Sequence, residues 1–207
     1  MQLSPEELPE NGYVILDKMD HLELVPFVQA YLKKSTLYSI AYFAANALVV
    51  VLMVFYFLLS LHQNKGFSAG KGFSYLAYGI GLAFLLIPLH EYIHVLAYRS
   101  QGAKNTSYDA NLKKFYFMAL ADRFVANKRE FTIVALAPFV AITLGLLIAL
   151  LFTGPYWSFT MLGMMFTHTA CCSGDFGLLS YFEFNRHKSP VTYDDNTNRV
   201  SYFLGKE

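Results

Sequence analysis

Hydrophobic residues in this chain gather in four long blocks that carry almost no charge and are separated by polar segments. The blocks cover residues 37–61, 75–98, 131–152 and 156–182. The hydrocarbon core of a bilayer is about 30 Å thick and requires about 20 apolar residues in a helix, so each block is long enough to cross it. Because lipid cannot satisfy backbone polar groups, each block is predicted to be helical. The pattern therefore predicts an all-α membrane protein built as a bundle of four transmembrane helices.

The segments outside the four predicted spans include both termini and a long loop after the second span. Residues 1–36 are predicted to form an N-terminal cytoplasmic or interfacial segment, in which residues 20–34 could form a short helix on the membrane surface. Residues 37–182 make up the predicted four-span membrane domain, and residues 183–207 are predicted to form a cytoplasmic tail. In the loop after the second span, the alternating stretch of residues 112–117 could form a small β-hairpin.

The composition supports lipid as the solvent of the blocks. Hydrophobic residues make up 55% of the 207 residues and charged residues only 15%, whereas a soluble domain carries about 25% charged residues. The net charge of +1 provides no basic field, so no nucleic-acid partner is expected. The only two cysteines, Cys171 and Cys172, are adjacent and predict no disulfide framework.

The distribution of Lys and Arg sets the expected orientation of the spans. The N-terminal segment, the long loop after the second span and the C-terminal tail together hold fourteen Lys and Arg residues, and the two other connections hold two. Cytoplasmic loops are enriched in Lys and Arg. Both termini and the long loop are therefore predicted to be cytoplasmic, in a multi-pass protein of the cell membrane.

The second predicted span contains the sequence His90-Glu91-Tyr92-Ile93-His94. Residues four apart lie on one face of a helix, so the two imidazoles could bind one metal ion together. Glu91 points near the same ion and could act as general base for a zinc-bound water, which is the role of the glutamate in H-E-x-x-H sites. Ionisable residues inside a span are costly and tend to be functional. The alternative is that the histidines hydrogen-bond to a neighbouring helix and that Glu91 pairs with a cation.

A catalytic zinc ion usually has three protein ligands and one open position. Asp175 is the one other charged residue in the four blocks. With both termini cytoplasmic, His90 and His94 lie eight and four residues from the cytoplasmic end of their span, and Asp175 lies seven residues from the same side. At 1.5 Å per residue these depths agree within about 5 Å, which favours Asp175 as the third ligand. Asp175 could instead pair with a cation at a helix end. Three further carboxylates are less favoured candidates for the third ligand because they lie outside or at the edge of the spans: Glu183, Asp109 and Asp122.

His168 precedes Asp175 by seven residues, so it should face the same way two turns deeper. It could stabilise an oxyanion or contact the substrate, and it could equally be a histidine that hydrogen-bonds between helices. Cys171 and Cys172 are interpreted as small packing residues, because adjacent side chains on a helix diverge by about 100°. Ligation of a soft metal ion by these thiols is the alternative.

Four motifs occur in order along the chain: Leu8-Pro9-Glu10-Asn11-Gly12-Tyr13, Leu89-His90-Glu91-Tyr92-Ile93-His94, Ala135-Leu136-Ala137-Pro138-Phe139 and Ser173-Gly174-Asp175. On these residues the chain, from about Leu8 to Phe182, resembles the bacterial Putative zincin peptidase family, which is distantly similar to the site-2 intramembrane metalloproteases. The resemblance implies zinc held by His90, His94 and Asp175, with Glu91 as base and peptide-bond hydrolysis near the cytoplasmic face of a bacterial membrane. The last motif departs from the Leu-Asp-Gly of site-2 enzymes. In those enzymes membrane-associated strands bind an extended substrate, and residues 113–118 could do so here or form an amphipathic surface loop.

The leading prediction is an intramembrane zinc metalloprotease, with Zn²⁺ as cofactor, that cleaves membrane or membrane-associated proteins or peptides. One alternative is a non-catalytic, zinc-binding pseudo-protease that leaves its clients intact. A less favoured alternative is a membrane haem protein with His94 and His168 as axial ligands, which would leave Glu91 without a role. The sequence specifies neither the substrate nor the oligomeric state.

Overall fold

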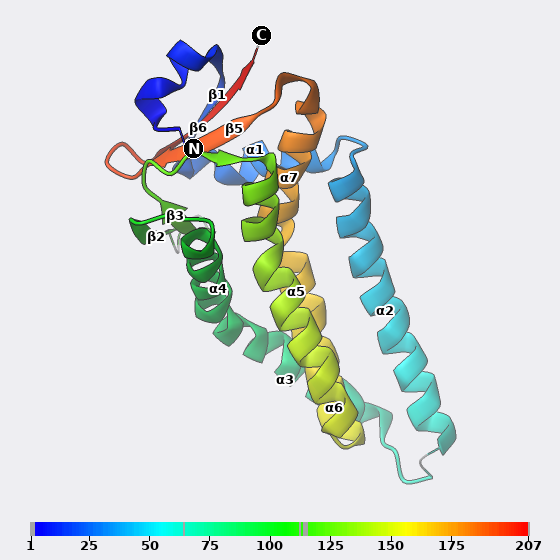
Figure 1. Ribbon diagram of the computed structural model, residues 1–207. Coiled ribbons are helices and arrows are strands. Elements are labelled where there is room, and N and C mark those ends of the chain that lie inside the picture. Colours follow the sequence, from blue (N-terminus) through cyan, green and yellow to red (C-terminus); the bar gives the residue numbers. More distant parts are fainter. Residues whose placement is uncertain (1–2, 64, 112, 114–115, 207) are drawn as a thin grey trace. The chain divides into compact units, whose positions relative to one another are not determined.

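The computed structural model describes residues 3–63, 65–111, 113 and 116–206 (Figure 1). The chain forms two compact units, each made of segments that are far apart in the sequence. Unit 1 consists of Met1–Ser39, Glu91–Ala137 and Gly174–Glu207, and unit 2 consists of Ile40–His90 and Pro138–Ser173. The sequence of unit 2 contains two charged residues, Lys65 and Lys71, and unit 1 holds all the others.

Unit 1 contains a four-stranded antiparallel sheet in the order β1-β6-β5-β4. β5 and β6 form a hairpin, in which Asp195 accepts hydrogen bonds from the backbone and the side chain of Asn198. β1 pairs with the other edge of β6 and so joins the two ends of the chain. The strands are β1 (Tyr13–Asp20), β4 (Ala126–Asn127), β5 (Val191–Asp195) and β6 (Val200–Lys206).

The prediction of an all-α protein is wrong in this respect: the described chain is mostly helical, but it also contains this sheet and a two-stranded sheet. The strands are short and partly polar, so none of them shows a strong strand pattern by itself. β1 also has its partner, β6, at the opposite end of the sequence, where Tyr13 is opposite Lys206.

The two-stranded sheet is an antiparallel hairpin of β2 (Thr106–Asn111) and β3 (Tyr116–Ala121). The stretch predicted to form a hairpin, residues 112–117, falls mostly on the connection between these strands. Residues 112, 114 and 115 lie outside the described residues. A hairpin is therefore present, and its strands extend to either side of the predicted stretch.

Two helices of unit 1, α1 (Leu24–Leu32) and α7 (Ser173–Phe184), contact the sheet through aromatic rings. Phe27 of α1 stacks on Phe203 of β6 with ring centroids 5.3 Å apart, and Tyr181 of α7 lies 4.6 Å from the Phe203 ring. Tyr181 and Phe203 are almost completely buried. Each such aromatic pair contributes about 0.5–1.5 kcal/mol beyond the burial of area. α1 lies within the stretch predicted to form a short N-terminal helix.

A buried polar cluster joins the β2–β3 hairpin to the four-stranded sheet. Nδ1 of the fully buried His21 lies 3.2 Å from a carboxylate oxygen of Asp109, and its Nε2 lies 3.3 Å from Ser201 Oγ. Arg199 donates to the other oxygen of Asp109 at 2.8 Å. Ser201 donates its hydroxyl hydrogen to Asp194 at 2.7 Å. Because Ser201 is buried and its hydrogen goes to Asp194, this Asp-His-Ser arrangement is structural and not that of a serine nucleophile.

The Asp194 carboxyl is expected to make the stability of unit 1 depend on pH. Burial raises the pKa of Asp194 above its ordinary value of 3.8, so the folded protein keeps this proton at a pH where the unfolded chain has lost it. The free energy of unfolding of the parent, relative to that of Asp194→Asn, should therefore fall as the pH rises from 3.8 through the raised pKa. Urea titrations of the purified proteins at a series of pH values measure this difference.

Asp195→Asn is the control for this prediction. Hydrogen bonds from Asn198 lower the pKa of the Asp195 carboxyl, so the difference between the parent and this variant should rise with pH instead. Differences that do not change with pH for either variant would contradict the expectation.

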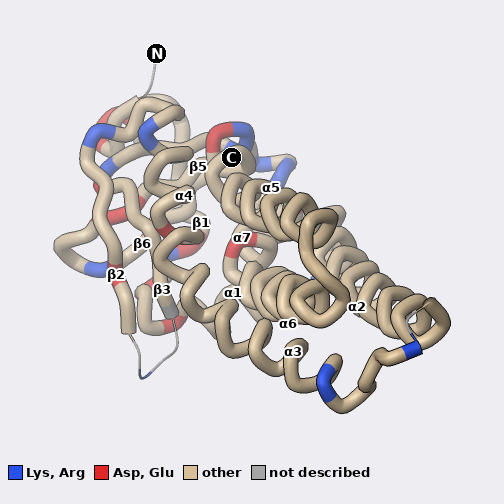
Figure 2. Tube along the Cα trace, turned by 90° about the horizontal axis from the view of Figure 1, so that it is seen from below, with Lys and Arg blue, Asp and Glu red and all other residues tan. Residues whose placement is uncertain are grey.

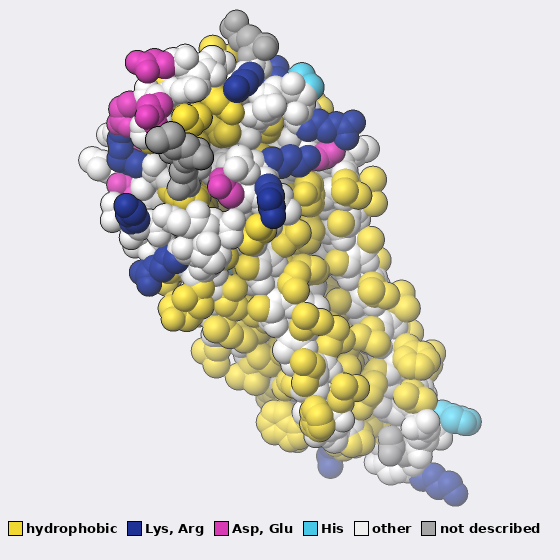
Figure 3. All heavy atoms as spheres, in the orientation of Figure 1, with side chains coloured by type: hydrophobic (Ala, Val, Ile, Leu, Met, Phe, Trp, Pro, Cys, Tyr) yellow, Lys and Arg dark blue, Asp and Glu magenta, His cyan; other side chains and the backbone are white. Residues whose placement is uncertain are grey.

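Unit 2 is helical and contains most of α2 (Leu37–Gln63), all of α3 (Ala69–Leu82) and α6 (Pro155–Cys171), and the second half of α5 (Lys128–Phe152). Figure 2 shows α2, α3 and α6 without acidic or basic residues along most of their length. Hydrophobic side chains cover the visible faces of α2 and α5 in Figure 3. Three helical segments are long and apolar enough to cross a membrane, namely α2, Ala69–Ser100 and α5, and at most 28% of the apolar window of each is buried. These helices indicate a membrane protein.

The fourth predicted span, residues 156–182, is divided into α6 and α7. The division occurs at Cys172, whose ψ of 8° departs from the helical value. Small and polar residues surround this point, from His168 to Asp175, so the local preference for a continuous helix is weak. Among the described residues, three segments and not four have the length and hydropathy of a span, and the predicted bundle of four transmembrane helices is not confirmed.

Two glycines allow α3 and α6 to approach each other closely in unit 2. A Cβ atom at Gly79 would lie 2.1 Å from the carbonyl oxygen of Thr160, and one at Gly163 would lie 2.4 Å from the carbonyl oxygen of Leu76. The Thr160 hydroxyl donates to the carbonyl of Tyr75 at 3.0 Å. Close approach at small residues is a main source of helix association in lipid.

Gly79→Ala is therefore expected to push α3 and α6 apart and to destabilise the protein by about 1–3 kcal/mol, as overpacked sites do. Gly81→Ala is the matched control on the same helix, because a Cβ atom there meets no atom within 4 Å. Its stability should stay equal or rise, since alanine is the better helix former. Thermal unfolding of the purified proteins in detergent measures both effects, and equal midpoints for the two variants would contradict the expectation.

Candidate metal centre

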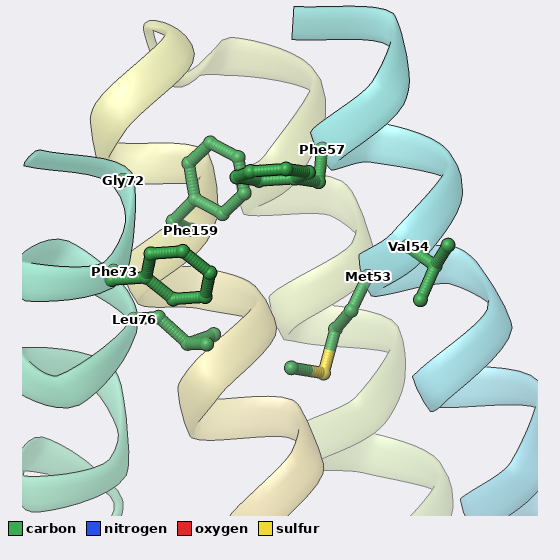
Figure 4. A pocket seen from close by; sticks show the side chains of 7 residues that line it. All are labelled: Met53, Val54, Phe57, Gly72, Phe73, Leu76 and Phe159. Carbon is green, nitrogen blue, oxygen red and sulfur yellow. The ribbon is translucent and has the colours of Figure 1, made fainter. Parts of the chain in front are cut away.

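Unit 2 contains an apolar cavity of about 190 Å³ among α2, α3 and α6 (Figure 4). The rings of Phe57, Phe73 and Phe159 lie close together at its wall, with the Phe57 and Phe73 centroids 5.4 Å apart. No lining side chain can titrate or bind a metal ion through N, O or a thiol, so the cavity does not account for hydrolytic chemistry. Its lining residues are Met53, Val54, Phe57, Gly72, Phe73, Leu76 and Phe159.

The candidate chemistry lies on α4 (Ile87–Ser100), which follows a short 3₁₀ turn. Pro88 stands in the first turn of α4, where proline is tolerated. His90 and His94 both fall within this helix, so they are one turn apart on one face, and Glu91 follows the first of them. The helix therefore gives the H-E-x-x-H residues the arrangement that metal binding requires.

In unit 1, the His94 ring is held on one side and faces a carboxylate on the other. Its Nδ1 lies 2.9 Å from the backbone carbonyl oxygen of Val134 on α5. A carbonyl can only accept, so Nδ1 carries the hydrogen, and in the neutral ring Nε2 carries the lone pair. Nε2 lies 3.1 Å from Asp175 Oδ1. Two ligand atoms of a tetrahedral zinc site, each about 2.0–2.2 Å from the ion, are about 3.3 Å apart, so this separation suits a shared zinc ion.

The carbonyl of Val134 is directed to His94 rather than into its own helix because of Pro138. In a regular helix the N–H of residue 138 would donate to the carbonyl of residue 134, but Pro138 lies inside α5 and has no N–H. Histidines that bind metals usually donate their other ring N–H to a carbonyl or carboxylate, which fixes the ring. Because Pro138 has no N–H, the Val134 carbonyl is available to accept the hydrogen bond that orients His94.

Asp175 lies in the first turn of α7, where the helix dipole favours a negative charge. Its side chain is largely buried. The other carboxylates weighed as third ligands have different partners: Glu183 contacts Lys128 and Arg186, Asp109 contacts His21 and Arg199, and Asp122 accepts from the backbone N–H of Asn196.

His168 and His90 meet within unit 2, where His90 Nδ1 lies 3.2 Å from His168 Nε2. The role of His168 as an oxyanion or substrate contact stays a prediction. The histidines of the alternative haem pair have different neighbours, since His94 contacts Val134 and Asp175.

Cys172, which the sequence predicts to be a small packing residue, lies beside His168. Its Sγ lies 3.8 Å from His168 Nε2, and the thiol is fully buried, whereas Cys171 is exposed. The four-residue spacing from His168 to Cys172, which equals that from His90 to His94, could have predicted that the two side chains share a helix face. This spacing is easily overlooked when Cys171 and Cys172 are interpreted together as adjacent packing residues.

Among the described residues, the side chains placed to hold a metal ion are thus His94 and Asp175 in unit 1, and His90, His168 and Cys172 in unit 2. A family described as "Putative zincin peptidase" matches residues 83–188, which is just over half of the chain and includes α4 and α7. The chain belongs to this family. Membership in the Putative zincin peptidase family points to a metallopeptidase that uses zinc. The predicted resemblance to this family is confirmed over residues 83–188, and the distant similarity to site-2 enzymes is not confirmed. No curated protein and no solved structure matches the chain.

Proposed function

We propose that this member of the Putative zincin peptidase family is an intramembrane zinc metalloprotease, related to the site-2 enzymes. His90, His94 and Asp175 are the proposed zinc ligands and Glu91 the general base. The observation that carries the proposal is the 3.1 Å approach of His94 Nε2 to Asp175, with Nδ1 fixed by a backbone carbonyl. His90 stands one turn before His94 on α4, at the spacing of an H-E-x-x-H zinc site.

Zinc bound at such a site polarises the scissile carbonyl and lowers the pKa of water. In the proposed reaction, the Glu91 carboxylate accepts a proton from the attacking water and then delivers it to the leaving amine. A helical substrate must unwind first, because its carbonyls are engaged within the helix. An extended segment could then pair with the β2–β3 hairpin by strand addition.

The proposed substrates are membrane or membrane-associated proteins or peptides, cleaved near the cytoplasmic face. The apolar helices supply the membrane setting, and the surplus of Lys and Arg in the termini and the long loop supports a cytoplasmic location for these segments. The proposed location is the bacterial cytoplasmic membrane.

Chelation tests the proposal. Membranes from cells that produce the parent protein should contain new peptide N-termini, detected by N-terminal labelling and mass spectrometry. These should disappear with 1,10-phenanthroline and return when Zn²⁺ is added. Zinc in the purified protein without any new N-termini would favour the pseudo-protease, and iron with a Soret band would favour the haem protein.

Pro138→Ala is expected to lower the affinity for zinc without lowering the stability of the metal-free protein. The alanine N–H completes the helix at Val134, and an interior proline costs about 3 kcal/mol, so the metal-free variant should be at least as stable as the parent. The restored N–H competes with His94 for the carbonyl, so zinc affinity should fall by about 10–100-fold. Thermal unfolding and competition with a chelating dye measure the two effects.

Pro155→Ala, at the start of α6, is the control and should bind zinc like the parent, since a proline at the first helical position replaces no helical hydrogen bond. Unchanged zinc affinity in Pro138→Ala would show that the Val134 carbonyl does not orient the ligand.

A further inference from the structure

A second group of side chains able to bind a metal lies in unit 2, around His168. His168 and Cys172 are four residues apart at the end of α6, and the Cys172 N–H donates to the His168 carbonyl at 3.1 Å, so the two side chains leave the same face. Cys172 Sγ lies 3.8 Å from His168 Nε2, and His90 Nδ1 lies 3.2 Å from the same nitrogen. His168 is 4% exposed and Cys172 0%.

One ring nitrogen therefore has two close polar neighbours. Nε2 of His168 carries either one lone pair or one hydrogen, so it can make one well-directed hydrogen bond, to His90 or to Cys172. A metal ion between the three groups would instead take one lone pair from each of them. The convergence of the three atoms is thus better suited to metal ligation than to hydrogen bonding alone.

The distances agree with this interpretation. With Zn–N bonds of about 2.0–2.1 Å and Zn–S bonds of about 2.3 Å, tetrahedral geometry places two nitrogen ligands about 3.3 Å apart and nitrogen and sulfur about 3.6 Å apart. The observed separations are 3.2 Å between the two imidazoles and 3.8 Å between imidazole and thiol. All three ligand atoms lie within 4.8 Å of one another. The two separations from His168 Nε2 thus differ from those of a tetrahedral site by about 0.1 and 0.2 Å.

We propose that His90, His168 and Cys172 form a second metal-binding set, which takes a divalent ion with affinity for thiolate, such as Zn²⁺ or Co²⁺. Thiolate and imidazole ligands select such ions over Mg²⁺ or Ca²⁺. The thiol loses its proton when the metal binds. This set is distinct from the proposed catalytic ligands in all but His90, and it does not depend on peptidase activity. Because His90 is shared, ions in both sets would have to use its two different ring nitrogens.

Cobalt spectroscopy of the full chain in detergent tests the proposal. A thiolate bound to Co²⁺ gives a charge-transfer band in the near ultraviolet that nitrogen and oxygen ligands do not give. The metal-free parent should develop this band when titrated with Co²⁺, and Cys172→Ser should lose it. Cys171→Ser, which changes the exposed neighbouring cysteine, should keep it. Asp175→Asn should also keep it, because Asp175 is outside this set.

Absence of the band in the parent, or its loss in Cys171→Ser and not in Cys172→Ser, would overturn the proposal. The parent measurement holds even if Cys172→Ser fails to fold, and His168→Gln, which should weaken or abolish the band, provides a second variant. A protein that shows the band but cleaves equally well with Glu91→Gln would retain this metal set and lose the proposed protease mechanism. Cleavage that depends on Glu91 in a protein without any thiolate band would support the proposed protease mechanism and exclude this second metal set.

Discussion

Replacement of Glu91 by glutamine is expected to slow peptide-bond cleavage by about 10²–10⁴-fold, which is the usual contribution of a general acid-base group. Glutamine has nearly the same size and can still form hydrogen bonds, but it can neither accept the proton of the attacking water nor return it to the leaving amine. Glu91 is not one of the proposed ligands, so the zinc content should remain that of the parent. The expected result is therefore a protein that is folded and loaded with zinc but inactive.

The measurement compares the rate at which the parent and Glu91→Gln generate the same new N-terminus in a membrane substrate. Glu130→Gln is a suitable control, because Glu130 lies at the start of α5 and accepts a hydrogen bond from the Asn127 backbone at 2.9 Å, which glutamine can also accept. This control should cleave at the parental rate. If Glu91→Gln cleaves as fast as the parent, the proposed chemistry is wrong, and if neither protein cleaves while both hold zinc, the pseudo-protease is favoured.

Hydropathy predicted much of the helical framework because a segment that crosses lipid must be long and apolar by itself, without help from distant residues. A span needs enough consecutive apolar residues, and residues 37–61, 75–98 and 131–152 all fall within the three segments able to cross a membrane. The fourth block met the same composition test. Its interruption at Cys172 depends on short-range backbone preferences that an average over 20 residues does not detect.

The place of β1 in the four-stranded sheet could not be predicted in the same way, because its partner β6 is distant in sequence. β1 has exposed hydrophobic residues such as Ile15 and a polar second half, and it becomes a strand by pairing with β6 from the other end of the chain. Phe27 and Tyr181 then cover this sheet with aromatic rings from two separate helices. None of these contacts is visible as a local pattern.

For the candidate site, sequence spacing identified the chemistry of single helices but not the contacts between them. The pairing of His94 with Asp175 was anticipated from their equal depth, and the structure places these side chains 3.1 Å apart. Pro138 was recognised only as part of a motif. Its effect, which is to leave the Val134 carbonyl available to His94, depends on a contact between two helices that the sequence does not show. Cys172 is a similar case, because its proposed role as a metal ligand depends on His90, which lies beside the same nitrogen of His168 but on another helix.

The second large effect is expected at Asp175, where Asp175→Asn should remove zinc from the proposed catalytic set and with it the stabilisation that bound zinc provides. The neutral amide is a poor ligand for zinc compared with a carboxylate. A ligand present at 1,000 times its dissociation constant stabilises the folded state by about 4 kcal/mol. The thermal midpoint of the parent should therefore rise when Zn²⁺ is added, and that of Asp175→Asn should rise much less. Glu183→Gln is the matched control on α7, because its carboxylate contacts Lys128 and Arg186 instead of His94.

The response to zinc also decides between the two interpretations of the contact between His94 and Asp175. If the pair were only an ion pair between a protonated imidazole and a carboxylate, Asp175→Asn would lower stability by the same amount with and without Zn²⁺. If the pair binds zinc, the loss appears mainly when Zn²⁺ is present, and Glu183→Gln keeps the full zinc-dependent rise. An equal zinc response in the parent and Asp175→Asn would exclude Asp175 as a ligand, because a carboxylate that holds the ion cannot be replaced by an amide without weakening the coupling between metal binding and folding.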